Sequence, residues 1–176
     1  MPINARLILD AVMEEYVMSP GGIHGVSHWA RVWENGLRLA TETGADVEVV
    51  KAFALIHDSK RWNDDDDPGH GPRAAVFART LRGRGLELGE ETFELLFVAC
   101  RDHTSGRTHP DPTVQTCWDA DRLDLGRVGI CPEPAFLCTE AASRAVMIDW
   151  ANGRSEACEM PDWVADAWGI EIEGAD

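Results

Sequence analysis

Residues 46–58 read DVEVVKAFALIHD, and this stretch decides the fold. Asp46 is a typical helix N-cap, and the apolar residues after it recur at the three- and four-residue spacing of one buried helix face. His57 and Asp58 follow where the apolar pattern ends, so both polar side chains leave the core at one point. A carboxylate buried there is costly unless it is paired or bound to metal. The stretch therefore predicts a core helix that carries a His-Asp pair at its carboxyl end.

Helical patterns continue on both sides of this segment, and Gly and Pro residues separate them. No alternating run of strand length, internal repeat or dividing linker interrupts the pattern. We therefore expect an all-α chain that forms one helical bundle over residues 1–176, with its motif core at about 24–125 and a C-terminal helix and acidic, Trp-bearing tail at about 139–176. The other helices are expected at 4–18, 27–43, 72–81, 90–103, 114–125 and 139–150, with a short one near Trp163.

The composition fits one globular domain with its own core. Of the 176 residues, 44% are hydrophobic, a share that can bury a core without disulfides. The net charge of −15 repels polyanions and argues against a nucleic-acid polymer or an anionic membrane as partner. The five cysteines form no close pair, which is typical of reduced thiols. Residues 1–10 hold no long apolar stretch and no later run approaches a membrane span, so we expect a cytoplasmic protein.

Six histidines are present, and any one of them alone is more often a core or surface residue than a ligand. The pair His57-Asp58 could ligate one divalent ion through nitrogen and oxygen, although a helix cap or an ion pair also explains such a dipeptide. His24 lies four residues before His28 on a glycine-rich loop, where it could contact substrate or transfer a proton. His109 precedes a proline in another loop and is expected to face solvent.

Three short stretches resemble the signatures of the HD superfamily: HWARV at 28–32, HDSK at 57–60 and DADRLD at 119–124. Their order, a His, then His-Asp, then a distant Asp on helices of one bundle, is more specific than any one of them. HGPRAA at 70–75 and RDHTSGR at 101–107 are similar to a subgroup with two extra histidines. That subgroup includes HD hydrolases that split diadenosine tetraphosphate symmetrically and hold a pair of iron ions.

The resemblance implies a binuclear metal centre. The first ion is expected at His28, His57, Asp58 and Asp121, and the second at His70, His103 and the shared Asp58. Asp121 is preferred to Asp119 because the family ligand follows an Ala and precedes a basic residue. Asp119 and Asp124 are then expected on the helix surface or behind the ligands. Divalent transition ions, with Fe or Mn first and Zn, Ni or Co next, suit these donors better than Mg.

Such a centre is expected to hydrolyse a phosphate mono- or diester, nucleotide-like in character, with a hydroxide activated by metal. Asp58 and Lys60 are the expected catalytic residues, since Lys60 matches a basic position of the family motif and could bind phosphate. His24, Arg73 and Arg107 are the further expected substrate contacts, because they flank the ligands and guanidinium groups suit phosphate.

Two other functions stay open at this point. The same six ligands would serve an HD-type di-iron oxygenase, which oxygen consumption and a mixed-valent iron signal would identify. The second alternative is a metal-binding module without enzymatic activity. Purified protein that holds no transition metal and folds equally well with a chelator would favour this alternative. In each case we expect a small phosphorylated molecule rather than a polymer or a membrane as the partner, and the sequence is compatible with a homodimer.

Overall fold

The computed structural model describes residues 2–170, so residues 171–176 of the expected tail lie outside the described residues. Within this range the regular structure is helical, and the pairing outside helices is limited to isolated bridges of Leu86 with Ile3 and Arg82. The elements are α1 (Ala5–Glu15), α2 (Val26–Thr43), α3 (Val47–Ile56), α4 (His70–Thr80), α5 (Glu90–Asp102), α6 (Pro112–Arg122), η1 (Leu125–Val128), η2 (Pro134–Phe136), α7 (Glu140–Ser143), α8 (Ala145–Glu156) and α9 (Trp163–Trp168). The predicted all-α fold is confirmed.

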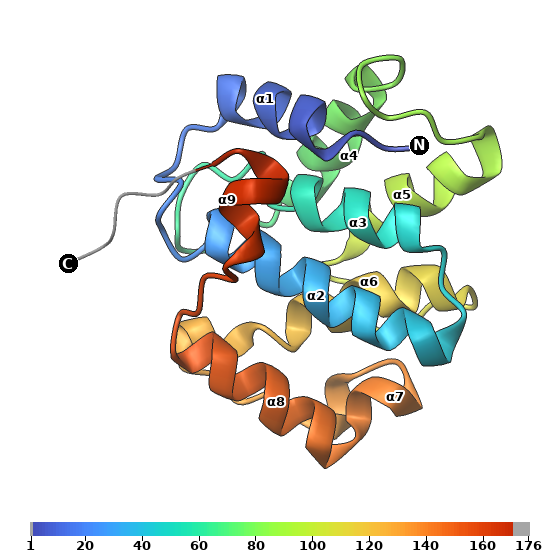
Figure 1. Cartoon of the computed structure of the whole chain (residues 1–176). Coiled ribbons are helices and arrows are strands. Elements are labelled where there is room, and N and C mark those ends of the chain that lie inside the picture. Colours follow the sequence, from blue (N-terminus) through green and yellow to red (C-terminus); the bar gives the residue numbers. More distant parts are fainter. Residues whose placement is uncertain (1, 171–176) are drawn as a thin grey trace.

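The central layer of the bundle is α2 and α3, which lie side by side and run in opposite directions (Figure 1). α1 and α4 lie on one side of this pair, and α7 and α8 lie on the other. Every residue from Val49 to Ile56 except Lys51 is buried. Because α2 begins where α3 ends, the first turn of α2 and the residues after α3 meet at the same end of the bundle.

Local sequence signals explain how the two central helices are joined. Gly44 has φ +71°, a left-handed conformation that glycine adopts without strain, and its N–H donates to the Ala40 carbonyl at the end of α2. Two residues later Asp46 caps α3, because its side chain accepts from the N–H groups of Glu48 and Val49. The predicted cap and the predicted buried face of α3 are both confirmed.

Several predicted helix boundaries differ from the structure, and three of the differences concern segments near the site or the end of the bundle. α4 begins at His70 rather than at Pro72, so His70 belongs to the helix, while its Nδ1 lies 2.5 Å from the Asp67 carbonyl oxygen of the preceding loop. The helix expected to run to Leu125 ends at Arg122, and the short helix η1 follows it. The helix expected at 139–150 is divided, because Arg144 has an extended backbone with ψ 135° between α7 and α8.

The C-terminal part of the described chain packs against the bundle. The indole rings of Trp33, Trp163 and Trp168 form one aromatic cluster, with centroids 5.0–6.1 Å apart. This cluster joins α9 to α2, and α9 crosses α2 near its amino end (Figure 1). Within residues 2–170, none of the helices combines the length and the apolar character that crossing a lipid bilayer requires.

Candidate metal centre

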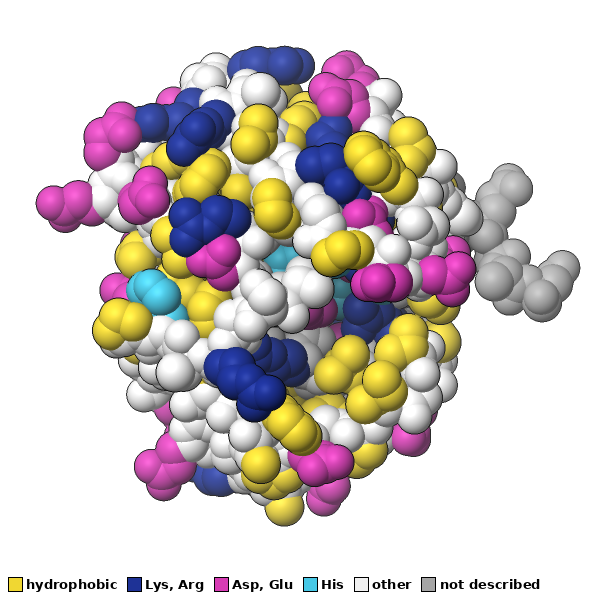
Figure 2. All heavy atoms as spheres, turned by 180° about the vertical axis from the view of Figure 1, so that it is seen from behind, with side chains coloured by type: hydrophobic (Ala, Val, Ile, Leu, Met, Phe, Trp, Pro, Cys, Tyr) yellow, Lys and Arg dark blue, Asp and Glu magenta, His cyan; other side chains and the backbone are white. Residues whose placement is uncertain are grey.

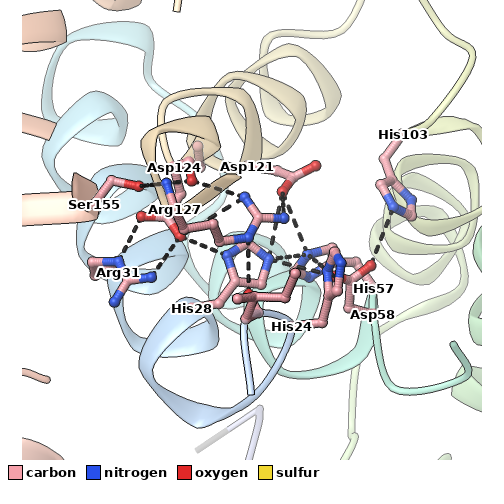
Figure 3. A network of polar contacts seen from close by, with 12 residues as sticks. His24, His28, Arg31, His57, Asp58, His103, Asp121, Asp124, Arg127 and Ser155 are labelled. Atoms are coloured by element: carbon pink, nitrogen blue, oxygen red, sulfur yellow. Dashed lines mark hydrogen bonds and ion pairs between the residues drawn. The ribbon is translucent and has the colours of Figure 1, made fainter. Parts of the chain in front are cut away.

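Four predicted ligands converge at the end of the bundle where α2 begins. His28 lies in the first turn of α2, His57 and Asp58 follow α3, and Asp121 lies in the last turn of α6. The Nε2 atoms of His28 and His57 are 3.1 Å apart. Asp121 Oδ1 lies 3.5 Å and 3.7 Å from these two nitrogens, and Asp58 Oδ2 lies 3.5 Å and 3.8 Å from them (Figure 3). Donors that share one ion have spacings of about 3–4 Å, so these four side chains form a candidate ion site.

A second cluster uses the other oxygen of Asp58. His70 is the first residue of α4, and His103 follows the last residue of α5. Their Nε2 atoms are 2.8 Å apart, and Asp58 Oδ1 lies 3.1 Å from His70 Nε2 and 3.8 Å from His103 Nε2. Asp58 therefore turns one oxygen toward each cluster, which is the arrangement of a carboxylate that bridges two ions.

The hydrogen bonds of the four ligand imidazoles decide which nitrogen faces the clusters. Each Nδ1 lies against an acceptor that cannot donate, so Nδ1 carries the proton and Nε2 of the neutral ring presents a lone pair. The acceptors are the Asp124 carboxylate for His28 (2.7 Å) and the carbonyls of Phe53 for His57 (3.1 Å), Asp67 for His70 (2.5 Å) and Cys100 for His103 (2.8 Å). Lone pairs that face each other at such short distances repel unless a cation lies between them. The residues present therefore fit divalent ions.

The two carboxylates of the centre are held in the ionised form that a metal ligand needs. Burial opposes ionisation of both, but contacts with the surrounding His side chains, and with Arg127 in the case of Asp121, keep the pKa of Asp58 and of Asp121 below the usual value. His24 adds to this effect, since its Nδ1 lies 2.8 Å from Asp58 Oδ2. Oxygen and nitrogen donors of this kind suit a divalent transition ion.

A buried ion pair behind the centre positions His28. Asp124 accepts the Nδ1–H of His28 and is itself held by Arg31, whose Nε and Nη2 donate to its two oxygens at 2.6 Å and 3.0 Å. Arg31 also donates to the Glu159 carbonyl, and Ser155 donates to the Asp124 carbonyl (Figure 3). The orientation of this one imidazole is thus tied to the C-terminal part of the chain.

Asp119 is not a ligand, in line with the choice of Asp121, but it does not lie on the helix surface as one reading of the sequence allowed. The side chain is fully buried and accepts from the N–H groups of Cys138 and Thr139 and from the Thr139 hydroxyl at 2.7–2.8 Å. Burial raises the pKa of Asp119, and these three donors oppose that rise. Asp119 therefore fastens the segment that leads into α7 onto α6.

The metal centre opens into a cavity of about 580 Å³. Figure 2 shows this face of the molecule, with His side chains visible inside a hollow and basic and hydrophobic side chains around it. Asp58, His70, His103 and Asp121 line the inner part, and His24 joins them from the loop before α2. The structure thus brings His24 to the site, as the sequence indicated.

The other three predicted substrate contacts are not brought to the cavity. The Lys60 ammonium pairs with Glu15 at 2.5 Å and lies over the Phe77 ring, because the turn after α3 directs this side chain toward α1 and α4. Arg73 donates to the Lys60 carbonyl and pairs with Asp67, so it stabilises the loop between the ligands. Arg107 is exposed and does not line the cavity. Lys60, Arg73 and Arg107 therefore lie outside the lining of the cavity, and their expected contacts with phosphate stay predictions.

Three other arginines line the cavity instead: Arg61, Arg122 and Arg127. Arg61 Nη1 lies 3.8 Å from Asp58 Oδ1, and Arg127 Nη2 lies 3.9 Å from Asp121 Oδ1. Arg61 flanks a predicted ligand in the sequence, whereas the sequence signatures assign no role to Arg122 and Arg127. The sequence does contain a pattern that indicates Arg127. This residue follows Asp121 and Asp124 at intervals of three residues, which places all three side chains on one side of a helical segment.

Comparison with solved structures connects this geometry to a known fold. The chain is similar to a predicted HD superfamily hydrolase from an uncultured Thermotogales bacterium, with 27% identity and a TM-score of 0.62 over 86% of this chain and 87% of that one. The fold is an HD-superfamily fold. No protein-family model matches the chain, and no curated protein sequence matches it.

The HD fold and the His and Asp clusters together support a metal-dependent hydrolase. They agree with the resemblance found in the three sequence signatures, since the predicted ligands of those signatures lie close together. The likeness to the subgroup that splits diadenosine tetraphosphate stays a prediction, as do the number and identity of the ions.

Proposed function

We propose that this protein is a metal-dependent phosphohydrolase that cleaves a phosphate mono- or diester, nucleotide-like in character. The observation that carries the proposal is the pair of clusters that share Asp58, with four Nε2 lone pairs directed inward. Divalent ions bound there, with Fe or Mn preferred, would lower the pKa of a water molecule and offset the charge of the phosphoryl oxygens. The similarity to a predicted HD superfamily hydrolase supports the same class.

The chain's own residues would bind and orient the ester. His28, His57, Asp58 and Asp121 would hold the first ion, and His70 and His103 would complete the second site with Asp58. Arg61 and Arg127 lie beside the carboxylates at the cavity wall, where guanidinium groups can bind phosphoryl oxygens. These cations also explain how a chain of net charge −15 can accept an anion.

His24 has a position suited to a proton carrier. Its Nδ1–H donates to Asp58 Oδ2, its ring lines the cavity, and its backbone carbonyl accepts from the Tyr16 hydroxyl at 2.9 Å. The Tyr16 contact fixes the loop, so the ring is held at the edge of the first cluster. We propose that His24 orients the Asp58 carboxylate and contacts the ester oxygen that leaves.

The test is hydrolysis of a panel of nucleotides and simple phosphate esters by protein loaded with Mn²⁺ or Fe²⁺. We expect the protein to release phosphate. Both the Asp58→Ala substitution and removal of the metal by a chelator should abolish this activity. Asp149→Asn is the matched control, because Asp149 is an exposed carboxylate on α8, outside the cavity. Activity retained in Asp58→Ala would contradict the proposal, and turnover that consumes oxygen would indicate the di-iron oxygenase instead.

A further inference from the structure

One wall of the cavity is apolar, and it comes from a single segment of the chain. Residues 125–137 follow the last metal ligand and include both short helices, η1 and η2. Six apolar side chains of this segment line the cavity: Leu125, Val128, Ile130, Pro132, Phe136 and Leu137. We call this set the apolar wall. Four of the predicted metal ligands, Asp58, His70, His103 and Asp121, line the same cavity.

Three of the six side chains of the apolar wall are exposed. Val128, Ile130 and Phe136 expose 41%, 53% and 58% of their surface, although they are among the larger apolar side chains of the described residues. Exposed apolar side chains elsewhere, such as Val76 and Val146, lie singly on other helices. Apolar side chains that gather on one concave surface are typical of a ligand site.

Polar contacts hold the apolar wall at a fixed place relative to the metal centre. The Arg127 N–H donates to the Ser155 hydroxyl at 2.8 Å, which fastens η1 to α8. At the other end, Asp119 accepts from Cys138 and Thr139, which fastens the segment after η2 to α6. Since α6 also carries Asp121, the wall and the first cluster are attached to the same helix. The wall is therefore formed before any ligand binds.

The two arginines that lie nearest the wall in the chain both donate to other groups of the protein. Arg127 directs its guanidinium toward Asp121 and donates to the carbonyls of Ile23 and Asp124. Arg122 donates to the carbonyls of Phe136 and Gly106, so its hydrogen-bonding groups are largely used within the chain. Within residues 125–137, the ionisable side chains that line the cavity are Arg127, Cys131 and Glu133.

We propose that the apolar wall binds the organic group of the phosphate ester, and that this group is an apolar or aromatic moiety held by its faces and not by hydrogen bonds at its edges. The inference rests on the proposed function, because the metal centre is where the phosphate of the same molecule would lie. It deepens that function by naming the substrate class: esters with a large apolar group are preferred over small ones. For nucleotides, the base contributes its ring area, and its identity matters little.

The binding test uses two phosphonates that cannot be hydrolysed, 2-phenylethylphosphonate and ethylphosphonate, titrated calorimetrically into the Mn²⁺-loaded protein. The larger ligand should bind about tenfold more tightly, as expected when a phenyl ring becomes partly buried. Ile130→Ser and Phe136→Ser should remove most of that preference and leave the affinity for ethylphosphonate unchanged. Both side chains are more than half exposed, so these variants should fold. Val146→Ser is the matched control, an apolar side chain that is 66% exposed on α8.

A parallel measurement of turnover separates this inference from the proposed function. The phosphate esters that carry the same two organic groups are 2-phenylethyl phosphate and ethyl phosphate. Their alcohol leaving groups are of similar reactivity. If ethyl phosphate is hydrolysed but the larger ligands bind no better, the inference is overturned and the proposed function stands. If neither these esters nor any nucleotide of the panel is hydrolysed but the wall variants still abolish the preference for 2-phenylethylphosphonate, the proposed function fails and the wall assignment stands. Equal loss of preference in Val146→Ser, or binding of neither phosphonate, overturns the inference.

Discussion

Gly71 lets α4 approach α5 closely enough for the second cluster to form. A Cβ atom at this position would lie 2.7 Å from the Cys100 carbonyl oxygen, 2.9 Å from the Arg101 carbonyl oxygen and 3.2 Å from His103 Nδ1. Two of these are backbone atoms, which cannot rotate away as a flexible side chain can. In Gly71→Ala, α4 must move by roughly 0.7 Å to restore ordinary contact, and His70 moves with it.

The cost of this substitution can be estimated from opposing effects. Overpacking of a tight interface costs about 1–3 kcal/mol, and alanine before Pro72 is additionally strained in a helical conformation. The helical preference of alanine over glycine offsets about 1 kcal/mol. We expect a net loss of about 1–2 kcal/mol of unfolding free energy, which lowers the melting temperature by roughly 2–8 °C in a chain of this size.

The local consequence should exceed the global one. His70 Nε2 and His103 Nε2 are 2.8 Å apart, so a shift of α4 separates the two imidazoles of the second cluster and leaves the first cluster intact. In Gly71→Ala we expect one ion per chain to bind at least about tenfold more weakly, measured by calorimetry and by metal analysis of dialysed protein.

Gly153→Ala is the matched control for this variant. Gly153 lies in α8 with no atom within 4 Å of an added Cβ, so the substitution should stabilise the protein by about 0.5–1 kcal/mol and leave metal binding unchanged. If Gly71→Ala melts at or above the wild-type temperature and binds both ions with unchanged affinity, the reasoning from this contact is refuted.

Three further predictions test individual side chains. Asp124→Asn should weaken binding at the first cluster by about 10–100-fold in a metal titration, because the amide is a poorer acceptor for His28 Nδ1–H; unchanged affinity would exclude the positioning role. Asp119→Ala leaves three buried donors without an acceptor and should cost about 1–3 kcal/mol in denaturant unfolding, whereas a value near zero would contradict its role in fastening the wall segment. Lys60→Ala should change stability by less than about 1 kcal/mol and keep the phosphatase rate within the range of wild type, since Lys60 pairs with the exposed Glu15; a large fall in rate would return Lys60 to the site.

The sequence by itself determined the helical class and the ligand types. The spacing of apolar residues in 46–58 predicted α3, because a buried helix face leaves a period that can be counted without knowing its partner. The cap at Asp46 and the left-handed Gly44 are local interactions, so they could also be predicted. The ligand positions followed from the HD signatures, which place a His or Asp at helix ends.

Only the tertiary structure decided which cations face the site and what covers it. Lys60 follows the ligand Asp58 by two residues in the chain, yet the turn after α3 sends its side chain to Glu15. Arg127 and the apolar wall reach the cavity because hydrogen bonds to Asp119 and Ser155 fix a segment that has little regular structure of its own. Local periodicity carries no information about such contacts, because the partners are far apart in sequence. The direction of a side chain after a helix end also depends on what packs against it.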